Sequence, residues 1–295
     1  MTAPAYHYPD TLDEACAVLA DGEDTMVYGG GTAIQILIKQ GVLFATDLVD
    51  VGRVPGLADI TETPGGLRVG PLVTLRRMET DPLVRSVVPL AAQVYGQVAN
   101  PRVRNTASVG GNVAHGDYRL DPPTALLVLD ARLELTSAGG TRTVAAREFF
   151  VDFQRTALAH GELITAIDLP RQPESAGAWF AKLSSLSVND WPCASAAALV
   201  LDAPRQRREV RLGLGALAHI PLFARFEVAA TATADEVVEQ AQEASAPLID
   251  PIPDIRGGAE FKRRLGLVAV EEAVRGSWKE HDDDRGSRWS WRRRR

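Results

Sequence analysis

Cysteine is scarce in this 295-residue chain, which has only Cys16 and Cys193. An iron–sulfur cluster or a cysteine-rich zinc site needs about four ligands held together, so we expect no metal on this chain. Two cysteines are also too few for a disulfide framework at this length, and sparse cysteine is typical of a reducing cytoplasm. The sequence therefore predicts a metal-free, cytoplasmic protein.

Long hydrophobic runs and an excess of positive charge are absent as well. No apolar stretch approaches the ~18 residues that a membrane span requires. From Gly276 onward the chain has seven basic and four acidic residues, whereas the rest has 25 basic and 34 acidic residues, a net charge of −9. A nucleic-acid-binding protein needs a basic face. We therefore expect neither a membrane span nor a nucleic-acid partner.

The residues that are present, 45% hydrophobic and 24% charged, are typical of a globular protein, and the length suits two or three domains. Over residues 1–57 the pattern predicts a helix capped by Thr11, strands at 25–28 and 47–51, and a second helix capped by Thr32. Such alternation predicts a small, mainly parallel sheet.

The remaining pattern predicts two further domains and a tail, and hence an α+β fold overall. Residues 58–175 alternate short helices with strands, which favours a larger mixed or antiparallel sheet. After a linker that contains Pro and Gly, residues 176–276 predict a C-terminal domain with an antiparallel sheet and helices. The helices expected there are at 221–230, 235–244 and 259–275. Residues 277–295 are predicted to be a disordered tail.

Residues 28–33, Tyr-Gly-Gly-Gly-Thr-Ala, form a first glycine loop between a predicted strand and a predicted helix. Glycine has no Cβ, so the backbone N–H groups of this loop can approach a phosphate, and a helix start adds partial positive charge. Ile34 stands where a Rossmann fingerprint has its last glycine, and no Gly-Lys-Ser/Thr follows as in a P-loop. The loop suits a pyrophosphate, and a tight structural turn is the alternative.

Residues 106–112, Thr-Ala-Ser-Val-Gly-Gly-Asn, form a second glycine loop, and Asp121 follows shortly after it. Hydroxyl, amide and carboxylate groups together suit a polyhydroxyl chain and the second side of a pyrophosphate. A structural turn is again the alternative. Two such loops far apart in the sequence favour one extended nucleotide cofactor that is held by two subdomains.

At these two loops the sequence resembles the FAD-binding medium subunits of the molybdenum hydroxylases, the family of carbon monoxide dehydrogenase and xanthine dehydrogenase. The first glycine loop matches the family's Ala-Gly-Gly-x-Ser-Leu type of motif, and Ser108–His115 matches its Thr-Ile-Gly-Gly-Asn type. Asp121 corresponds to the aspartate that follows. Residues 254–265, Asp-Ile-Arg-Gly-Gly-Ala-Glu-Phe-Lys-Arg-Arg-Leu, resemble the family's Asp-x-Arg-x-x-Ala-x-Tyr-Arg-x-x-Leu signature.

The resemblance covers about residues 4–276 and implies a PCMH-type fold, in which two subdomains clasp FAD and a third domain follows. It implies that both glycine loops contact the cofactor and that Ile164 and Lys182 lie near the isoalloxazine ring. The implied FAD contacts are Tyr28, Gly29, Gly30, Gly31, Thr32, Ala33, Ser108, Gly110, Gly111, Asn112, Ala114, Asp121, Ile164 and Lys182. It implies no catalytic acid or base and no metal ligand.

The function that the resemblance implies is electron relay. Substrate is oxidised at a molybdenum cofactor on a large partner subunit, and electrons pass through two [2Fe–2S] clusters on a small partner subunit to FAD on this chain. They then leave to quinone, oxygen, NAD or another acceptor, and the implied assembly is a dimer of heterotrimers. Two alternatives stay open: a self-contained flavin-dependent oxidase or dehydrogenase, and a non-catalytic nucleotide-binding assembly protein.

Overall fold

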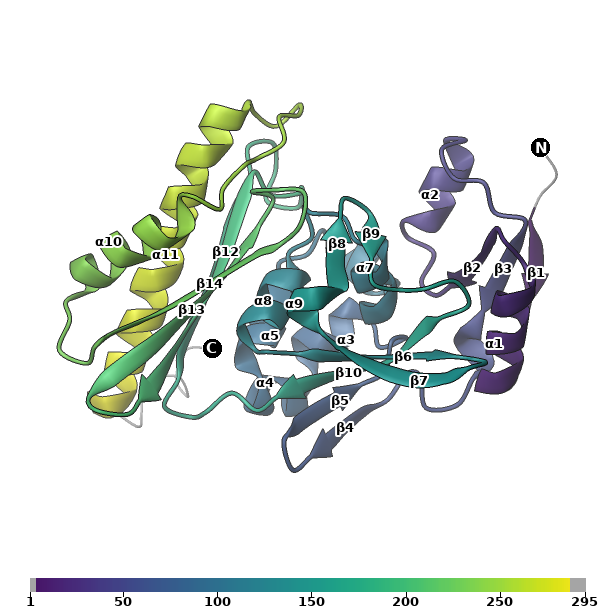
Figure 1. Ribbon diagram of the computed structural model, residues 1–295, viewed down its shortest axis with the longest axis horizontal. Coiled ribbons are helices and arrows are strands. Elements are labelled where there is room, and N and C mark those ends of the chain that lie inside the picture. The colour runs from purple at the N-terminus through teal and green to yellow at the C-terminus, as the bar shows by residue number, and fades with distance from the viewer. Residues whose placement is uncertain (1–3, 287–295) are drawn as a thin grey trace. The chain divides into compact units, whose positions relative to one another are not determined.

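The computed structural model describes residues 4–286, and these form two compact units (Figure 1). The first unit comprises Met1–Asp117 and Asp130–Arg171, and the second comprises Tyr118–Leu129 and Gln172–Arg295. The second unit therefore takes one short segment from the middle of the region predicted as a single domain. Within residues 4–286, no helix is both long enough and apolar enough to cross a membrane.

The first unit contains a small parallel sheet, as the sequence predicts. Its strands lie in the order β1-β3-β2, and β3 pairs in parallel with both neighbours. Helix α1 begins after Thr11, whose side chain accepts a hydrogen bond from the N–H of Glu14, and it buries Ala15, Cys16 and Leu19 against Val49 and its neighbours. The elements of this part are β1 (Ala5–His7), α1 (Leu12–Asp21), β2 (Thr25–Tyr28), α2 (Ile34–Lys39), β3 (Asp47–Asp50) and a 3-10 turn at Val51–Arg53.

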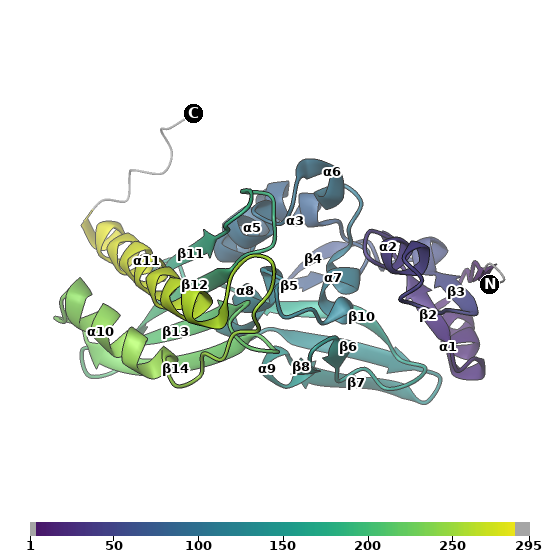
Figure 2. The same ribbon diagram turned by 90° about the horizontal axis from the view of Figure 1, so that it is seen from above.

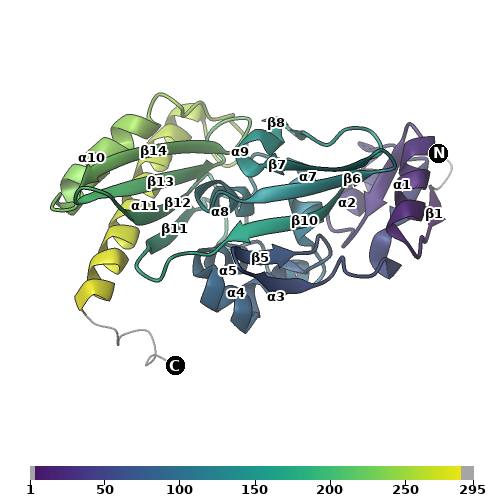
Figure 3. The same ribbon diagram turned by 60° about the horizontal axis from the view of Figure 1, so that its bottom comes forward.

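The first unit also contains a five-stranded antiparallel sheet in the order β4-β5-β10-β6-β7 (Figure 3). The strands are β4 (Ile60–Thr63), β5 (Gly66–Val69), β6 (Arg132–Ser137), β7 (Gly140–Ala145) and β10 (Leu163–Pro170). The other elements are α3 (Leu75–Thr80), α4 (Pro82–Val87), α5 (Pro89–Gly96), α6 (Pro101–Arg104), α7 (Val109–His115), α9 (Ala146–Phe149), β8 (Phe150–Asp152) and β9 (Arg155–Thr156). Three of these helices begin with proline, whose fixed φ suits the first helical position.

The second unit is built on a four-stranded antiparallel meander with helices on both faces (Figure 2). Alternate residues of the central strands face α11 and α10, whereas the opposite face receives α8, where Gly213 lies against the backbone of Thr124. The elements are α8 (Pro122–Val128), β11 (Gly177–Leu183), β12 (Ala194–Ala203), β13 (Arg207–Gly215), β14 (Leu222–Ala229), α10 (Ala234–Ser245) and α11 (Ala259–Gly286). With the sheets of the first unit, which include the β8-β9 pair, this confirms the predicted α+β fold class.

The helix predicted at 221–230 is wrong, because this segment is strand β14. Leu222, Ala224, Phe226 and Val228 alternate along it and pack against the core of the second unit. Their period of two residues fits a strand. Pairing with β13 outweighs the helix propensity of the alanine, arginine and glutamate residues of this segment.

The predicted start of the disordered tail is also wrong, because α11 continues to Gly286. Ser277, Trp278 and His281 are buried, and the Arg208 guanidinium lies over the Trp278 ring, 4.1 Å from its centroid. Residues 287–295 lie outside the described residues. The domain boundaries at 57 and 175 stay predictions.

Candidate functional site

The two glycine loops meet within the first unit. A Cβ built on Gly29 would lie 2.9 Å from the Oγ of Ser108, and one on Gly30 would overlap the carbonyl group of Thr106. Glycine at these two positions therefore allows the backbone of one loop to lie against the other. The predicted cofactor residues of both loops form one cluster, although nearly eighty residues separate them in the sequence.

The second glycine loop is held by its own hydrogen bonds. The Oγ of Ser108 accepts from the N–H of Gly111 at 3.2 Å and so caps α7, and the N–H of Gly110 donates to the carbonyl of Pro71 at 2.8 Å. Both Ser108 and Gly110 are buried. Ser108 and Gly110 therefore stabilise the conformation of the loop. The sequence predicted them only as contacts of the cofactor.

Asn112 has an unsatisfied polar atom. Its Oδ1 is buried and has no hydrogen-bond partner among the described residues. A buried acceptor without a partner costs free energy, and a bound molecule that brings a donor relieves that cost. Asn112 thus fits a group with hydroxyl or amide hydrogens. Ala114 follows on the same short helix and is half-buried.

The first glycine loop leaves backbone donors available. Within residues 4–286, the N–H groups of Gly30, Gly31 and Thr32 form no hydrogen bond. Gly31 has a φ of +70°, a left-handed conformation that favours glycine. Thr32 does not cap the next helix as predicted, because Ala33 occupies the N-cap position of α2 and supplies no side-chain bond. Because α2 has only six residues, we attribute anion binding to the N–H groups of the loop and not to the N-terminus of the helix.

A cavity of about 410 Å³ opens beside the first glycine loop. It contains two cationic side chains that the sequence analysis missed, Lys39 and Arg102. Gln35 also lines it and donates from Nε2 to the hydroxyl of Tyr28 at 2.6 Å. The lining residues are Tyr28, Gly30, Gly31, Thr32, Gln35, Ile36, Lys39, Arg102, Val103 and Thr106. Free N–H groups and two cations beside one cavity suit a phosphate-bearing ligand.

The helical spacing of two of these residues was a usable signal. Gln35 and Lys39 follow Gly31 at intervals of four, so they share one face of a helix that starts at the loop. Arg102 carried no comparable signal. It lies four residues before Thr106, and only the meeting of the two loops brings it to the cavity.

Asp121 and Lys182 form a buried ion pair in the second unit. The Lys182 Nζ lies 2.6 Å from the Asp121 Oδ2, and the two side chains are 5% and 4% exposed. Lys182 is therefore not a solvent-exposed charge, and its predicted position near the isoalloxazine ring stays a prediction. The Asp121 Oδ1 is buried without a hydrogen-bond partner in the described structure. Burial raises the pKa of Asp121 above its ordinary value, while the charge and hydrogen bond of Lys182 and the nearby Ser195 hydroxyl act in the opposite direction.

Ile164 lies in β10 opposite Leu135 of β6 and is 5% exposed. Its side chain therefore belongs to the buried part of the five-stranded sheet of the first unit. The predicted position of Ile164 near a flavin ring stays a prediction.

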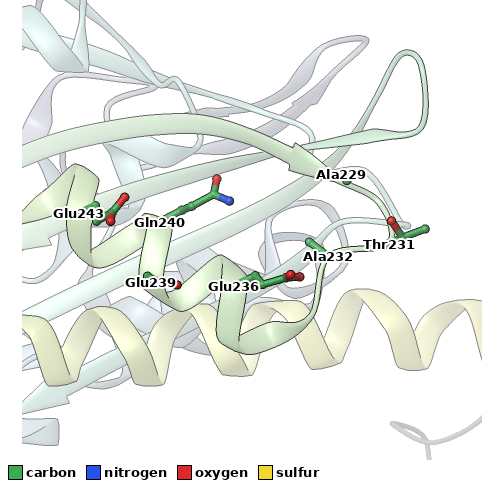
Figure 4. Close-up of a pocket in the computed structure, with 7 residues that line it drawn as sticks. All are labelled: Ala229, Thr231, Ala232, Glu236, Glu239, Gln240 and Glu243. Carbon is green, nitrogen blue, oxygen red and sulfur yellow. The ribbon is translucent and has the colours of Figure 1, made fainter.

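A second cavity, of about 560 Å³, lies in the second unit along α10 (Figure 4). Its charged side chains are Glu236, Glu239 and Glu243, and Glu236 is already engaged with Thr233 at the start of the helix. An acidic lining repels phosphate. Among residues 4–286, no group of three or more His, Cys, Asp and Glu side chains could hold a metal ion. The cavity beside the first glycine loop is therefore the better candidate.

Comparison with protein families identifies a match over residues 2–172 to the family described as the FAD binding domain in molybdopterin dehydrogenase. The chain is 31% identical over 282 residues to the nicotine 6-hydroxylase medium subunit of Paenarthrobacter nicotinovorans, covering 93% of this chain and 96% of that protein. It is 28% identical to the carbon monoxide dehydrogenase medium chain of Hydrogenophaga pseudoflava, covering 92% and 96%.

Solved structures are similar over the same extent. A chain of carbon monoxide dehydrogenase from Hydrogenophaga pseudoflava superposes with a TM-score of 0.89 at 27% identity, covering 95% of this chain and 98% of that one. A chain of quinoline 2-oxidoreductase from Pseudomonas putida 86 gives a TM-score of 0.86 at 27% identity, covering 94% and 98%. The likeness therefore extends well beyond the matched domain.

Proposed function

Because the chain belongs to the FAD-binding medium subunits of the molybdopterin dehydrogenases, we propose that its two glycine loops hold the pyrophosphate of FAD and that the bound flavin relays electrons. As a member of this family the chain is a subunit of an oxidoreductase complex. The observation that carries the assignment of the loops is their contact beside a cavity with free N–H groups and two cations.

The residues of the first unit fit a dinucleotide cofactor. The N–H groups of Gly30, Gly31 and Thr32 are free to bind phosphate oxygens, and Lys39 and Arg102 supply positive charge to the same cavity. Tyr28, Gly29 and Ala33 complete the loop that presents these donors. FAD supplies one- and two-electron redox chemistry, for which this chain's residues provide position and electrostatic environment.

In this proposal the other predicted FAD contacts lie near the ribityl chain and the isoalloxazine ring. The second glycine loop and α7 carry five of these contacts, namely Ser108, Gly110, Gly111, Asn112 and Ala114. The Oδ1 of Asn112, which has no partner in the described structure, supports a hydrogen bond to the cofactor. Asp121, Lys182 and Ile164 are proposed for the flavin side. The buried ion pair of Asp121 with Lys182 supports their part in this, because it holds two charged groups in a site closed to water. No residue is assigned as a catalytic acid or base.

The proposed source of electrons is a partner chain. Relatives of this chain are named as medium chains of carbon monoxide dehydrogenase and of nicotine 6-hydroxylase, which supports an assembly of several subunits. We place the molybdenum cofactor on a large partner subunit and two [2Fe–2S] clusters on a small one, in a dimer of heterotrimers in the cytoplasm. Quinone, oxygen and NAD are the candidate acceptors.

Purification of the chain from its native host tests the relay. We expect flavin absorption together with co-purifying molybdenum and iron–sulfur subunits, and flavin reduction by an organic substrate only when these partners are present. Reduction of the isolated flavoprotein by the substrate would instead favour a self-contained flavin enzyme. A chain that co-purifies with no partner and carries no flavin would favour a non-catalytic role.

A further inference from the structure

The segment 254–265, singled out by its sequence signature, does not line the cavity beside the glycine loops. In the second unit its charged residues form a network instead. Arg256 makes two parallel bonds to Asp190, from Nε to Oδ2 at 2.9 Å and from Nη2 to Oδ1 at 2.8 Å. Such fork-shaped pairing fixes both partners in distance and orientation.

The part of this network nearest to α11 is buried. Lys262 is 0% exposed, and its Nζ donates to the carbonyl of Ile252 at 2.8 Å and lies 2.9 Å from the Oδ1 of Asp254. That same Oδ1 accepts the backbone N–H of Arg256 at 2.9 Å. Asp254 therefore anchors the main chain of Arg256 to the start of α11, and the guanidinium of Arg256 is directed to Asp190.

Arg256 holds residues 184–193, which we call the connecting segment, at three places. Its carbonyl accepts from the Oγ of Ser185 at 3.0 Å and from the Sγ of Cys193 at 3.6 Å, while its side chain binds Asp190. One residue thus contacts the segment near its start, in its second half and at its end. The segment's own packing is poor, because Leu186 and Val188 are 62% and 84% exposed.

The connecting segment adjoins the Asp121–Lys182 pair. It begins directly after β11, the strand that carries Lys182. The guanidinium of Arg119, two residues before Asp121, lies over the Trp191 ring of this segment, 4.4 Å from the ring centroid. The charge of Lys182 also contributes to the lowered pKa of Asp190, after the larger effect of the Arg256 hydrogen bonds.

We propose that Arg256 is a positioning residue that fixes the connecting segment beside the Asp121–Lys182 pair and thereby sets the surroundings of the flavin ring. The second half of this inference rests on the proposed function, whereas the first half does not. The sequence signature at 254–265 then has a physical role, which is to hold the loop between β11 and β12 in one conformation.

Hydrogen–deuterium exchange on the full-length chain tests the first half without any cofactor. We expect Arg256→Gln to speed exchange across residues 184–193 by about tenfold or more, as loss of a partly buried bidentate pair should. Asp190→Asn should do the same despite its opposite change of charge. Arg275→Gln is the matched control, since Arg275 lies on α11 and pairs with Glu271 and Asp235. Wild-type exchange in a folded Arg256→Gln variant would overturn the proposal.

The midpoint potential of the FAD-loaded protein tests the second half. We expect Arg256→Gln and Arg256→Lys both to shift the potential, because lysine keeps the charge but cannot form the two parallel bonds. Arg275→Gln should leave it unchanged. A potential that Arg256→Lys restores to the wild-type value, or that neither variant shifts, would overturn the positioning role. Failure of the wild-type chain to bind FAD would contradict the proposed function and would leave the exchange result interpretable.

Discussion

At the scale of single residues, Gly30 is constrained to be glycine both by packing within the fold and by its proposed phosphate contact. Its N–H forms no hydrogen bond in the described structure. A Cβ at this position would overlap the Thr106 carbonyl even without a bound ligand. We predict that Gly30→Ala lowers the free energy of unfolding by about 1–3 kcal/mol, the usual cost of overpacking, and that flavin is lost with it. Urea unfolding measures this. Gly65→Ala is the control, because a Cβ there meets nothing within 4 Å.

Lys39 and Arg102 allow a cleaner test of phosphate binding, because both side chains are exposed. We predict that Lys39→Gln combined with Arg102→Gln weakens FAD binding by about tenfold or more, since charge-assisted hydrogen bonds to phosphate are lost. The melting temperature of the flavin-free protein should stay the same. Flavin titration measures the affinity, with Arg155→Gln as a control that removes one positive charge from another exposed position of the first unit. Equal affinity in the double variant and the control would remove these two cations from the site.

At the scale of elements, the sequence predicted well wherever local signals and tertiary packing agree. The helix after Thr11 and the parallel strands of the first unit followed from a capping residue and from β-type runs. Strand β14 was missed because its residues favour a helix locally and its pairing with β13 is a long-range event. The end of α11 was missed because its charged residues look solvated, while Trp278 is buried.

Trp278 should therefore contribute substantially to the second unit. We predict that Trp278→Ala lowers the free energy of unfolding by about 3–5 kcal/mol, as large core truncations do. Lys279→Ala, at the exposed neighbouring position on α11, should have little effect. Chemical denaturation of both variants measures the difference. Equal stabilities would mean that the last turns of α11 do not pack on the sheet.

The ion pair between Asp190 and Arg256 predicts a dependence of stability on pH. Hydrogen bonds from Arg256 hold the pKa of Asp190 below its ordinary value, the Trp191 N–H and the charge of Lys182 lower it further, and burial opposes them. A lowered pKa in the folded state means stability that is present above the unfolded-state pKa, about 3.9, and lost as the pH falls through the folded-state value. Wild type should therefore melt above Asp190→Asn at neutral pH, with the gap closing in acid. A gap independent of pH would contradict this.

At the scale of the whole molecule, the candidate site was predictable in part. The two glycine loops stood out because glycine, hydroxyl and amide groups gather at turns, and the resemblance to a known family supplied their common ligand. Arg102 and the buried environment of Lys182 were not predictable, because each depends on segments that only the fold brings together. The scarcity of cysteine agrees with the proposed function, in which this chain carries the flavin and partner subunits carry the metals.

The flavin content of the purified chain tests the central claim most directly. The wild-type protein, freed of unbound cofactor and then unfolded, should release a stoichiometric amount of FAD, measured by visible absorption and chromatography. The Lys39→Gln/Arg102→Gln variant should release less under the same treatment. A folded wild-type chain that is colourless and takes up no FAD on titration would contradict the account.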